Sequence, residues 1–332
     1  MATLEITFLQ NQLEERKRRL ETAIALAPQK GGLSGLLHEV DAALERMDKG
    51  RYGICEECHE SIEADRLMSD PLVRYCLDHL TGPQRAALQR DLDLASQVQR
   101  KLLPQVSLCH IGWETGYHYA PVGPVSGDYC DLIPSEGQLF FVLGDVSGKG
   151  VAASMLMTQL HALFRSLTGM GLPLCQIVTQ ANRMFCESAL AGQYVTLVCG
   201  LAKPDGEVEI HNAGHLPAII VGRGGVHRVE STGLPLGMFL DGDFSATCLR
   251  LEAGDTMFFY TDGLSEARSS NEDANDEADD EYGVDRVARL VGEQAARPPA
   301  ALIAAFVDDL RGFAGGDAFH DDLTLLAIQR RG

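Results

Sequence analysis

Apolar side chains recur at helical spacing near the start of the chain. One stripe consists of Ile6, Leu9, Leu13, Leu20 and Ile24, with Lys17 interrupting it. Pro28 and the pair Gly31 and Gly32 break this pattern. A second stripe of Leu37, Val40, Leu44 and Met47 then runs to Gly50, which stands in the position of a C-terminal cap. Two stripes joined by a short breaker predict helices that pack antiparallel, or that form a coiled coil with another chain.

A third stripe lies between two prolines. Pro83 suits the first turn of a helix, and Pro104 ends it. The apolar positions between them are Leu88, Leu92, Ala95, Val98 and Leu102. We therefore predict a linker helix within 83–105, between an N-terminal module at 1–82 and a domain at 106–332. Such a helix is suited to relaying a signal.

From about Trp113 onward, short apolar runs alternate with turns rich in Gly, Asp and Pro. Such runs predict β-strands, which we expect at 139–143, 195–201, 218–221, 256–260 and 323–328. Helices are expected at 151–168, 174–190 and 299–313. Strands in meander order with helices between them predict an α+β layered domain. The segment 266–285 is strongly acidic, so a mobile surface loop is expected there.

Composition narrows the class of protein. The 332 residues suffice for more than one core, and the net charge of -19 argues against nonspecific nucleic-acid binding. No apolar run approaches the length that spans a membrane, and no signal peptide is recognisable at the start. The cysteine count, 9, is odd, and all but three of these residues are scattered among apolar neighbours. We expect a cytoplasmic protein with reduced thiols and no membrane contact.

Three cysteines gather in one short segment. Cys55 and Cys58 form one pair with a two-residue gap, and Cys76 and His79 form a second pair with the same gap. Two chelating pairs on separate turns suit the four ligands of a structural zinc site. The competing interpretation is that these cysteines are simply buried. His79 is the weakest member of the set, because the chain also has His38, His59 and His110.

The residues around these pairs add a family resemblance. Residues 43–58 read ALERMDKGRYGICEEC and residues 74–79 read RYCLDH. Over about residues 1–82 the chain resembles the DksA/TraR zinc-finger family, in which a helical hairpin also precedes the finger. That family usually has Cys where His79 stands. Its hairpin can carry acidic residues into RNA polymerase, but the tip here, at 28–35, has no Asp pair. We therefore expect a sensory or dimerising module, with a homodimer as the assembly.

Acidic residues mark the ends of three apolar runs in the remainder of the chain: Asp145, Asp262, and the adjacent Asp321 and Asp322. Carboxylates brought together in one fold bind hard cations such as Mg²⁺ or Mn²⁺, and two such ions can activate a water to hydrolyse a phosphate ester. A single Asp of this kind is more often a turn residue or a helix cap. The metal-site interpretation therefore depends on the set of aspartates.

Six motifs in order carry a second resemblance. They are VSGDYCD at 125–131, GDVSGKGVAA at 144–153, NAGHLP at 212–217, GLPLG at 233–237, YTDGLSEA at 260–267 and DDLT at 321–324. With DLASQVQRKLLP at 93–104, they closely resemble the SpoIIE/RsbU branch of the metal-dependent protein serine/threonine phosphatases, from about residue 90 to the end. The resemblance implies an αββα sandwich and an intact enzyme. It also implies a phosphorylated protein as substrate, often an anti-sigma-factor antagonist with a STAS fold.

The same resemblance implies a role for each motif residue. Asp145 would bridge two Mn²⁺ or Mg²⁺ ions, with the Val146 carbonyl as a further ligand. Asp262 and Asp321 would each bind one metal, and Asp322 is the weaker candidate of its pair. Asp128 would hold a metal-bound water.

Three further residues bear on the chemistry. Lys149 stands where this branch commonly has His. It would attract phosphate or tune the catalytic water, or it is a solvated residue at a helix start. His215 is expected to hydrogen-bond within a turn rather than to act as a general acid, and Cys130 has no obvious base.

Two other functions compete with the phosphatase. The first is a zinc-finger protein that binds the transcription machinery, with a phosphatase-like domain as scaffold. The second is a nucleotide hydrolase, but the chain has no phosphate-binding P-loop.

Overall fold

The computed structural model describes residues 3–26, 31–63, 66–67, 70–79, 82–190, 192–269, 281–316, 319 and 321–332. For residues 3–8, 26, 31–32 and 82–83 it describes the backbone alone. Pro28, the side chains of Ile6 and Pro83, and most of the predicted acidic loop (270–280) therefore lie outside the description.

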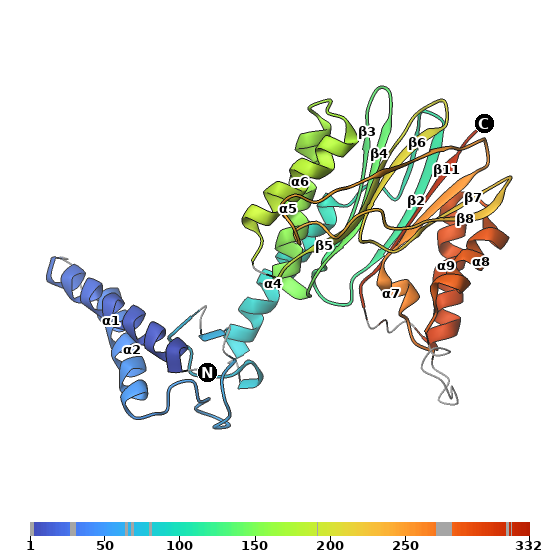
Figure 1. The fold of residues 1–332 in the computed structure, drawn as a ribbon. Coiled ribbons are helices and arrows are strands. Elements are labelled where there is room, and N and C mark those ends of the chain that lie inside the picture. The colour runs from blue at the N-terminus through green and yellow to red at the C-terminus, as the bar shows by residue number, and fades with distance from the viewer. Residues whose placement is uncertain are drawn as a thin grey trace. The chain divides into compact units, whose positions relative to one another are not determined.

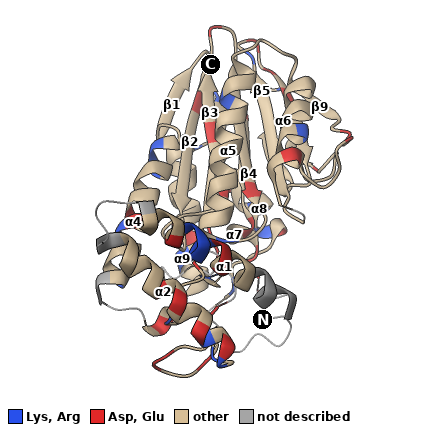
Figure 2. Cartoon of the chain, turned by 90° about the vertical axis from the view of Figure 1, so that its left-hand side faces the viewer, with Lys and Arg blue, Asp and Glu red and all other residues tan. Residues whose placement is uncertain are grey.

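The chain divides into two compact units, Met1–Asp91 and Leu92–Gly332, called here the N-terminal and C-terminal units. The division falls inside helix α4 (Gly82–Leu102), within the predicted linker (Figure 1). The division predicted at 82 and 105 remains a prediction. Lys and Arg are interspersed with Asp and Glu along the chain rather than gathered on one element (Figure 2). Among the described helices, none is both long and apolar enough to cross a membrane.

The N-terminal unit contains the predicted hairpin, built from α1 (Thr3–Leu26) and α2 (Gly31–Asp48). Leu9 and Leu13 of α1 join Val40 and Ala43 of α2 in one buried cluster. Lys17 interrupts the apolar stripe because its ammonium pairs with Asp41 of α2, at 2.7 Å. The hairpin therefore packs within one chain, and a coiled coil with a second chain remains a prediction.

Gly50 ends α2 as the sequence predicts. It has a left-handed backbone with φ of +64°, which glycine adopts without strain. The N–H of Arg51 donates to the Arg46 carbonyl at 2.8 Å, and the N–H of Gly50 donates to the Met47 carbonyl at 3.0 Å. This pair of bonds is the Schellman motif, and it turns the chain from the helix into the cysteine segment.

The C-terminal unit contains two antiparallel sheets. The six-stranded sheet has the order β1 (Ser107–His110), β2 (Trp113–Ala120), β11 (Leu323–Arg330), β10 (Thr256–Tyr260), β7 (Ala218–Gly222) and β8 (Gly225–Val229). The five-stranded sheet has the order β3 (Asp128–Pro134), β4 (Leu139–Val146), β5 (Val195–Ala202), β6 (Glu207–Ala213) and β9 (Ala246–Arg250).

Helices cover the outer faces of both sheets. Helices α5 (Gly150–Thr168) and α6 (Leu174–Ser188) lie on the five-stranded sheet, whereas α8 (Val284–Gln294) and α9 (Pro299–Ala314) lie on the six-stranded sheet (Figure 1). Neighbouring side chains on a strand point to opposite faces. Phe258 accordingly stacks on Phe306 of α9, with ring centroids 4.4 Å apart. Phe259 packs against Phe141 between the sheets, with ring centroids 5.1 Å apart. The predicted αββα sandwich is confirmed.

Strand order and register bring the acidic residues to one end of the sandwich. In the β3–β4 ladder, Asp128 lies directly opposite Asp145. Asp262 follows β10 as predicted and begins the short helix α7 (Asp262–Ser265). Asp321 and Asp322 precede β11 rather than follow a strand, which corrects the sequence interpretation. Because β11 runs antiparallel to β10, its beginning lies beside the end of β10.

Candidate active site and metal centres

Asp128 is buried where the two sheets meet. Its carboxylate oxygen Oδ2 accepts hydrogen bonds from the hydroxyl groups of Thr261, at 3.1 Å, and Thr324, which lie beside β10 and in β11. Its backbone N–H donates to the Ser126 hydroxyl at 3.0 Å. Burial, and then the nearby Asp145, raise the pKa of Asp128 well above its usual value. Residues of both sheets therefore fix the Asp128 carboxylate opposite that of Asp145.

A second buried carboxylate on β3 provides an internal contrast. Asp131 is fully buried, and Arg165 of α5 donates two hydrogen bonds to it, each 2.8 Å long. A bidentate guanidinium neutralises a buried carboxylate in the ordinary structural way. Asp128 instead faces the acid Asp145. Two ionised acids opposite one another in a buried ladder are costly, and either a proton or a bound cation relieves that cost.

Asp145 and Asp262 belong to the same group of closely spaced acids. Burial, followed by the charges of Asp262, Asp321 and Asp322, raises the pKa of Asp145 to about 7. Burial and then Asp321 raise the pKa of Asp262. The ordinary carboxylate pKa is near 4, so burial first and the repulsion between neighbouring acids second both oppose ionisation at this end of the sandwich. A set of rigidly held carboxylate oxygens under such repulsion suits Mg²⁺ or Mn²⁺.

The close packing of the cluster depends on glycine at three positions. A Cβ atom on Gly263 would lie 2.1 Å from the Asp322 carbonyl oxygen, and one on Gly144 would lie 2.7 Å from the Thr196 carbonyl oxygen. A Cβ on Gly127 would lie 3.0 Å from the Val146 carbonyl oxygen and 3.4 Å from Asp145 Oδ1. Gly127 therefore lets the chain pass close to the Asp145 carboxylate and the Val146 carbonyl, the two groups predicted to share a metal.

The adjacent Asp321 and Asp322 have different partners. Asp322 Oδ1 accepts the backbone N–H of Val122 at 2.7 Å, so its carboxylate fastens the segment after β2. Asp321 Oδ2 accepts a hydrogen bond from Lys149 Nζ at 2.8 Å, and its Oδ1 accepts the N–H of Asp322 at 2.9 Å. Asp322 is thus tied to the backbone, whereas Asp321 pairs with an exposed side chain, and Asp321 remains our prediction for the metal ligand of the pair.

His215 has both ring nitrogens occupied. Nε2 donates to the Tyr260 carbonyl at 3.1 Å, so Nδ1 accepts the Thr196 hydroxyl at 2.9 Å. Its backbone N–H donates within the turn to Asn212 Oδ1, at 2.9 Å. Burial lowers the pKa of His215 to about 4, so the ring is neutral. The side chain thus joins β5 to the end of β10, a role that extends beyond the turn predicted for it.

Gln99 is a buried residue whose role the sequence did not indicate. On α4, Leu88 and Val98 were placed in the apolar stripe, but they are exposed, whereas Gln99 is buried. Its amide nitrogen donates to the Ser126 carbonyl at 2.7 Å, and its amide oxygen accepts the Ser126 N–H at 3.0 Å. Because Ser126 in turn bonds Asp128, Gln99 holds the loop that positions the buried acid. A signal was available: Gln99 lies four residues after Ala95 on the predicted stripe.

The cysteine segment brings the predicted zinc ligands together. Side-chain ligand atoms of Cys55, Cys58, Cys76 and His79 lie within 4.8 Å of one another. Cys58 Sγ and Cys76 Sγ are 3.8 Å apart, and Cys76 Sγ is 3.2 Å from His79 Nδ1. A tetrahedron with zinc–sulfur bonds of about 2.3 Å has sulfur atoms about 3.8 Å apart, so the residues fit zinc. His79 is the histidine of this cluster.

Backbone hydrogen bonds prepare one thiol of the cluster, that of Cys55, for metal. Burial raises the pKa of the Cys55 thiol, but backbone hydrogen bonds at Cys58, Cys76 and Glu57 outweigh it and lower the pKa to about 6. A thiolate is the form that binds metal. By contrast, burial raises the pKa of Cys130 well above its usual value, which makes it a poor nucleophile.

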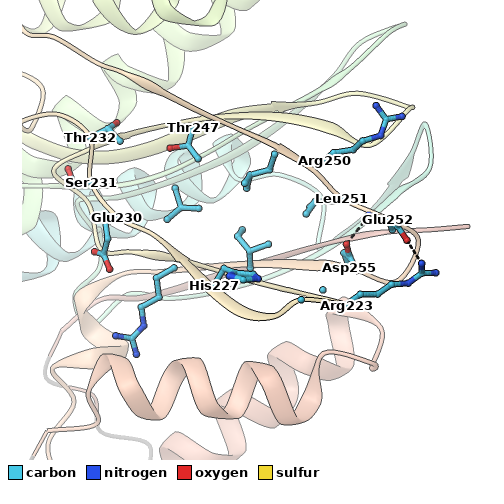
Figure 3. Close-up of a pocket in the computed structure, with 16 residues that line it drawn as sticks. Arg223, His227, Glu230, Ser231, Thr232, Thr247, Arg250, Leu251, Glu252 and Asp255 are labelled. Atoms are coloured by element: carbon cyan, nitrogen blue, oxygen red, sulfur yellow. Dashed lines mark hydrogen bonds and ion pairs between the residues drawn. The ribbon is translucent and has the colours of Figure 1, made fainter.

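A cavity of about 650 Å³ opens between the edge strands β8 and β9 (Figure 3). Its lining includes Ile220, Val229 and Leu251, and its charged rim includes Arg223 paired with Glu252 at 2.7 Å. Asp255, at the beginning of β10, lies in this cavity, whereas Asp262 follows the end of that strand. The cavity is therefore distinct from the carboxylate cluster, and chemistry rather than size identifies the candidate active site.

The layered fold and the acidic cluster together define a phosphatase-type domain. The structure is similar to the SiaA-PP2C domain of Pseudomonas aeruginosa, with a TM-score of 0.62 and 19% identity over 74% of this chain and 98% of that one. The family model of Stage II sporulation protein E (SpoIIE) matches residues 135–331. The chain belongs to this family. A second model, the prokaryotic dksA/traR C4-type zinc finger, matches residues 50–78, just short of His79.

Two curated bacterial proteins are similar to the chain in sequence. Protein IcfG of Synechocystis is 26% identical over 272 residues, which cover 72% of this chain and 41% of IcfG. Phosphoserine phosphatase RsbU of Bacillus subtilis is 25% identical over 251 residues, which cover 74% of this chain and 71% of RsbU. The chain thus spans less than half of one relative and most of the other.

Proposed function

We propose that this chain is a metal-dependent protein phosphatase that hydrolyses phosphoserine or phosphothreonine. The observation that supports it best is the buried opposition of Asp128 and Asp145, with Asp262 and Asp321 at the same end of the sandwich. Membership of the SpoIIE family and similarity to the phosphoserine phosphatase RsbU support the same reaction. The structure describes no nucleophilic Cys or Ser–His pair at this end that would favour a covalent route.

Asp145, the Val146 carbonyl, Asp262 and Asp321 would hold two Mn²⁺ or Mg²⁺ ions. Such ions neutralise the phosphate charge and supply a nucleophilic water near neutral pH. Residues of the chain would orient the water, hold a proton and attract the phosphate. Asp128 is held through Oδ2 by two hydroxyl groups, so its carboxylate can orient water and hold a proton at a fixed place. Lys149 is largely exposed beside the cluster, where its ammonium would attract the phosphate dianion.

The substrate we propose is a phosphorylated regulatory protein, with an anti-sigma-factor antagonist of STAS fold as the first candidate. This identification depends on the motifs shared with the SpoIIE/RsbU branch. The N-terminal unit would serve as a sensory or dimerising module with a structural zinc ion. Helix α4 is continuous through the division between the units, and its Gln99 holds the loop beside Asp128. A cytoplasmic homodimer remains our expectation.

The test is hydrolysis of an aryl phosphate by the purified chain with Mn²⁺. Replacing Asp145 by Ala should lower the rate at least about 100-fold, because that carboxylate is central to the charge cluster. Asp241→Ala is the matched control, since its side chain is 88% exposed and its partner Arg183 is 4.0 Å away. Unchanged hydrolysis by Asp145→Ala would refute the proposed function. Comparing phosphoproteomes of cells with the wild type and Asp145→Ala would then identify the substrate.

A further inference from the structure

Lys149 occupies a defined position beside the carboxylate cluster. It is the N-cap residue of α5, and its neighbours Gly148 and Gly150 both have left-handed backbones, with φ of +95° and +75°. Its side chain makes no capping hydrogen bond to the helix. The ammonium instead reaches Asp321 Oδ2 at 2.8 Å, across 172 residues of sequence. The loop therefore directs the positively charged ammonium of Lys149 into the acidic site.

Both oxygens of Asp321 are engaged in this arrangement. Oδ2 accepts the Lys149 ammonium, and Oδ1 accepts the backbone N–H of Asp322 at 2.9 Å. Because the ammonium is also near Asp262, it lowers the pKa of that carboxyl, which burial and Asp321 otherwise raise. A protein ammonium thus supplies part of the positive charge that a divalent ion would supply.

We propose that Lys149 is an internal counter-ion that competes with the divalent cation for Asp321. This inference rests on the proposed function, which makes Asp321 a metal ligand. A Mg²⁺ ion would lie about 2.0–2.1 Å from a ligating oxygen and needs a lone pair directed at it. An ammonium on the same oxygen occupies one of its lone pairs and repels the incoming charge. The Lys149–Asp321 pair therefore weakens the binding of a metal at Asp321.

The competition gives Lys149 a second position. Its four-carbon stem is flexible, so an ammonium displaced from Asp321 remains at the mouth of the site. There it can meet the oxygens of a substrate phosphate. Loading of the cation would then expose the phosphate-attracting charge, and the unloaded site would keep that charge paired. Lys149 should make the resting site bind cations more weakly than its carboxylates alone would.

The test measures Mn²⁺ binding without any substrate. The full chain is freed of loosely bound ions by dialysis, its zinc content is checked by mass spectrometry, and free Mn²⁺ is titrated by electron paramagnetic resonance. Lys149→Met keeps the stem and removes the charge. It should bind Mn²⁺ about three- to tenfold more tightly, because an exposed ion pair and one repelling charge are lost. Lys149→Arg keeps the charge and should stay close to the wild type.

Lys203→Met is the matched control. Lys203 also pairs with a carboxylate, Glu207, at 3.1 Å, so the control makes the same change in net charge elsewhere on the same unit. Its Mn²⁺ affinity should match that of the wild type. Equal affinities for Lys149→Met and Lys203→Met would overturn the proposal, and so would weaker binding by Lys149→Met.

Aryl phosphate hydrolysis, assayed in parallel, separates this proposal from the proposed function. Hydrolysis that persists in Asp145→Ala would refute the phosphatase function, while the Mn²⁺ titration would still decide whether Lys149 competes. A higher KM for the aryl phosphate in Lys149→Met, with unchanged Mn²⁺ affinity, would make Lys149 a substrate contact only. That result would refute competition between Lys149 and the cation for Asp321.

Discussion

The two candidate metal centres are built in opposite ways. The zinc ligands come from two short pairs between Cys55 and His79, and backbone hydrogen bonds inside that segment already lower the pKa of Cys55. The carboxylate ligands are separated by up to 176 residues, from Asp145 to Asp321, and only strand register brings them together. A local chelate can therefore be recognised from spacing, whereas a long-range site needs the fold. We therefore predict that the zinc centre stabilises the fold of the N-terminal unit, whereas the carboxylate centre depends on the fold of the C-terminal unit.

The largest effect should come from breaking the zinc cluster. Cys76→Ser removes a buried ligand, and structural zinc contributes apparent binding free energies of about 10–16 kcal/mol in zinc-finger peptides. We expect loss of zinc and loss of hydrogen-exchange protection across residues 50–79. Exposed Cys109→Ser is the control and should retain zinc. Zinc retained at full occupancy in Cys76→Ser would show that the four residues do not act as one site.

Gly263→Ala should disable the carboxylate site by distorting it. Its Cβ would lie 2.1 Å from the Asp322 carbonyl oxygen, so the segment before β11 must move. Overpacking of this kind costs about 1–3 kcal/mol of unfolding free energy, and we expect hydrolysis to fall by about 100-fold because Asp321 moves with the backbone. Gly137→Ala is the control, since nothing lies within 4 Å of its Cβ. Zinc content should not change in either variant. Wild-type hydrolysis by Gly263→Ala would contradict the assigned geometry.

Thr324→Val tests the support of Asp128. The valine keeps the shape but removes the hydroxyl that donates to Asp128 Oδ2. Supporting hydrogen bonds of this kind are typically worth 10–100-fold in metal affinity or activity, so we expect a fall of about tenfold. Thr158→Val is the control, because its hydroxyl bonds only the Ser154 carbonyl of its own helix, at 2.9 Å. Equal kcat and Mn²⁺ affinity for both variants would leave Thr324 without a functional role.

Gln99→Leu should have the smallest effect of the four. It leaves the buried Ser126 N–H and carbonyl without their side-chain partner, at a cost of about 1–3 kcal/mol of unfolding free energy. Hydrolysis should fall a few-fold as the loop before Asp128 loosens. Gln97→Leu, at an exposed position of the same helix, is the control. A thermal melt and a rate that match this control would show that α4 does not support the site.

The strands that the sequence predicted well are those with uninterrupted apolar runs. The run 256–260 coincides with β10, and 139–143 and 323–328 lie within β4 and β11. β3 was missed because it carries two buried acids, Asp128 and Asp131, in place of apolar residues. β8 and β9 were missed because both are edge strands with weak patterns: β8 exposes all of its residues but the last, and β9 exposes every second residue.

Local chemistry was determined by the sequence itself. The spacing of Cys55, Cys58, Cys76 and His79, the glycine cap at Gly50 and the order of the acidic motifs are properties of short segments, and short segments constrain their own geometry. Only the tertiary structure decided which acids meet: Asp128 opposite Asp145, Asp321 toward Lys149, Asp322 toward the backbone of Val122. It also decided that Gln99 is buried and Val98 exposed. The physical reason is that strand register and side-chain burial depend on partners far along the chain, which no local pattern contains.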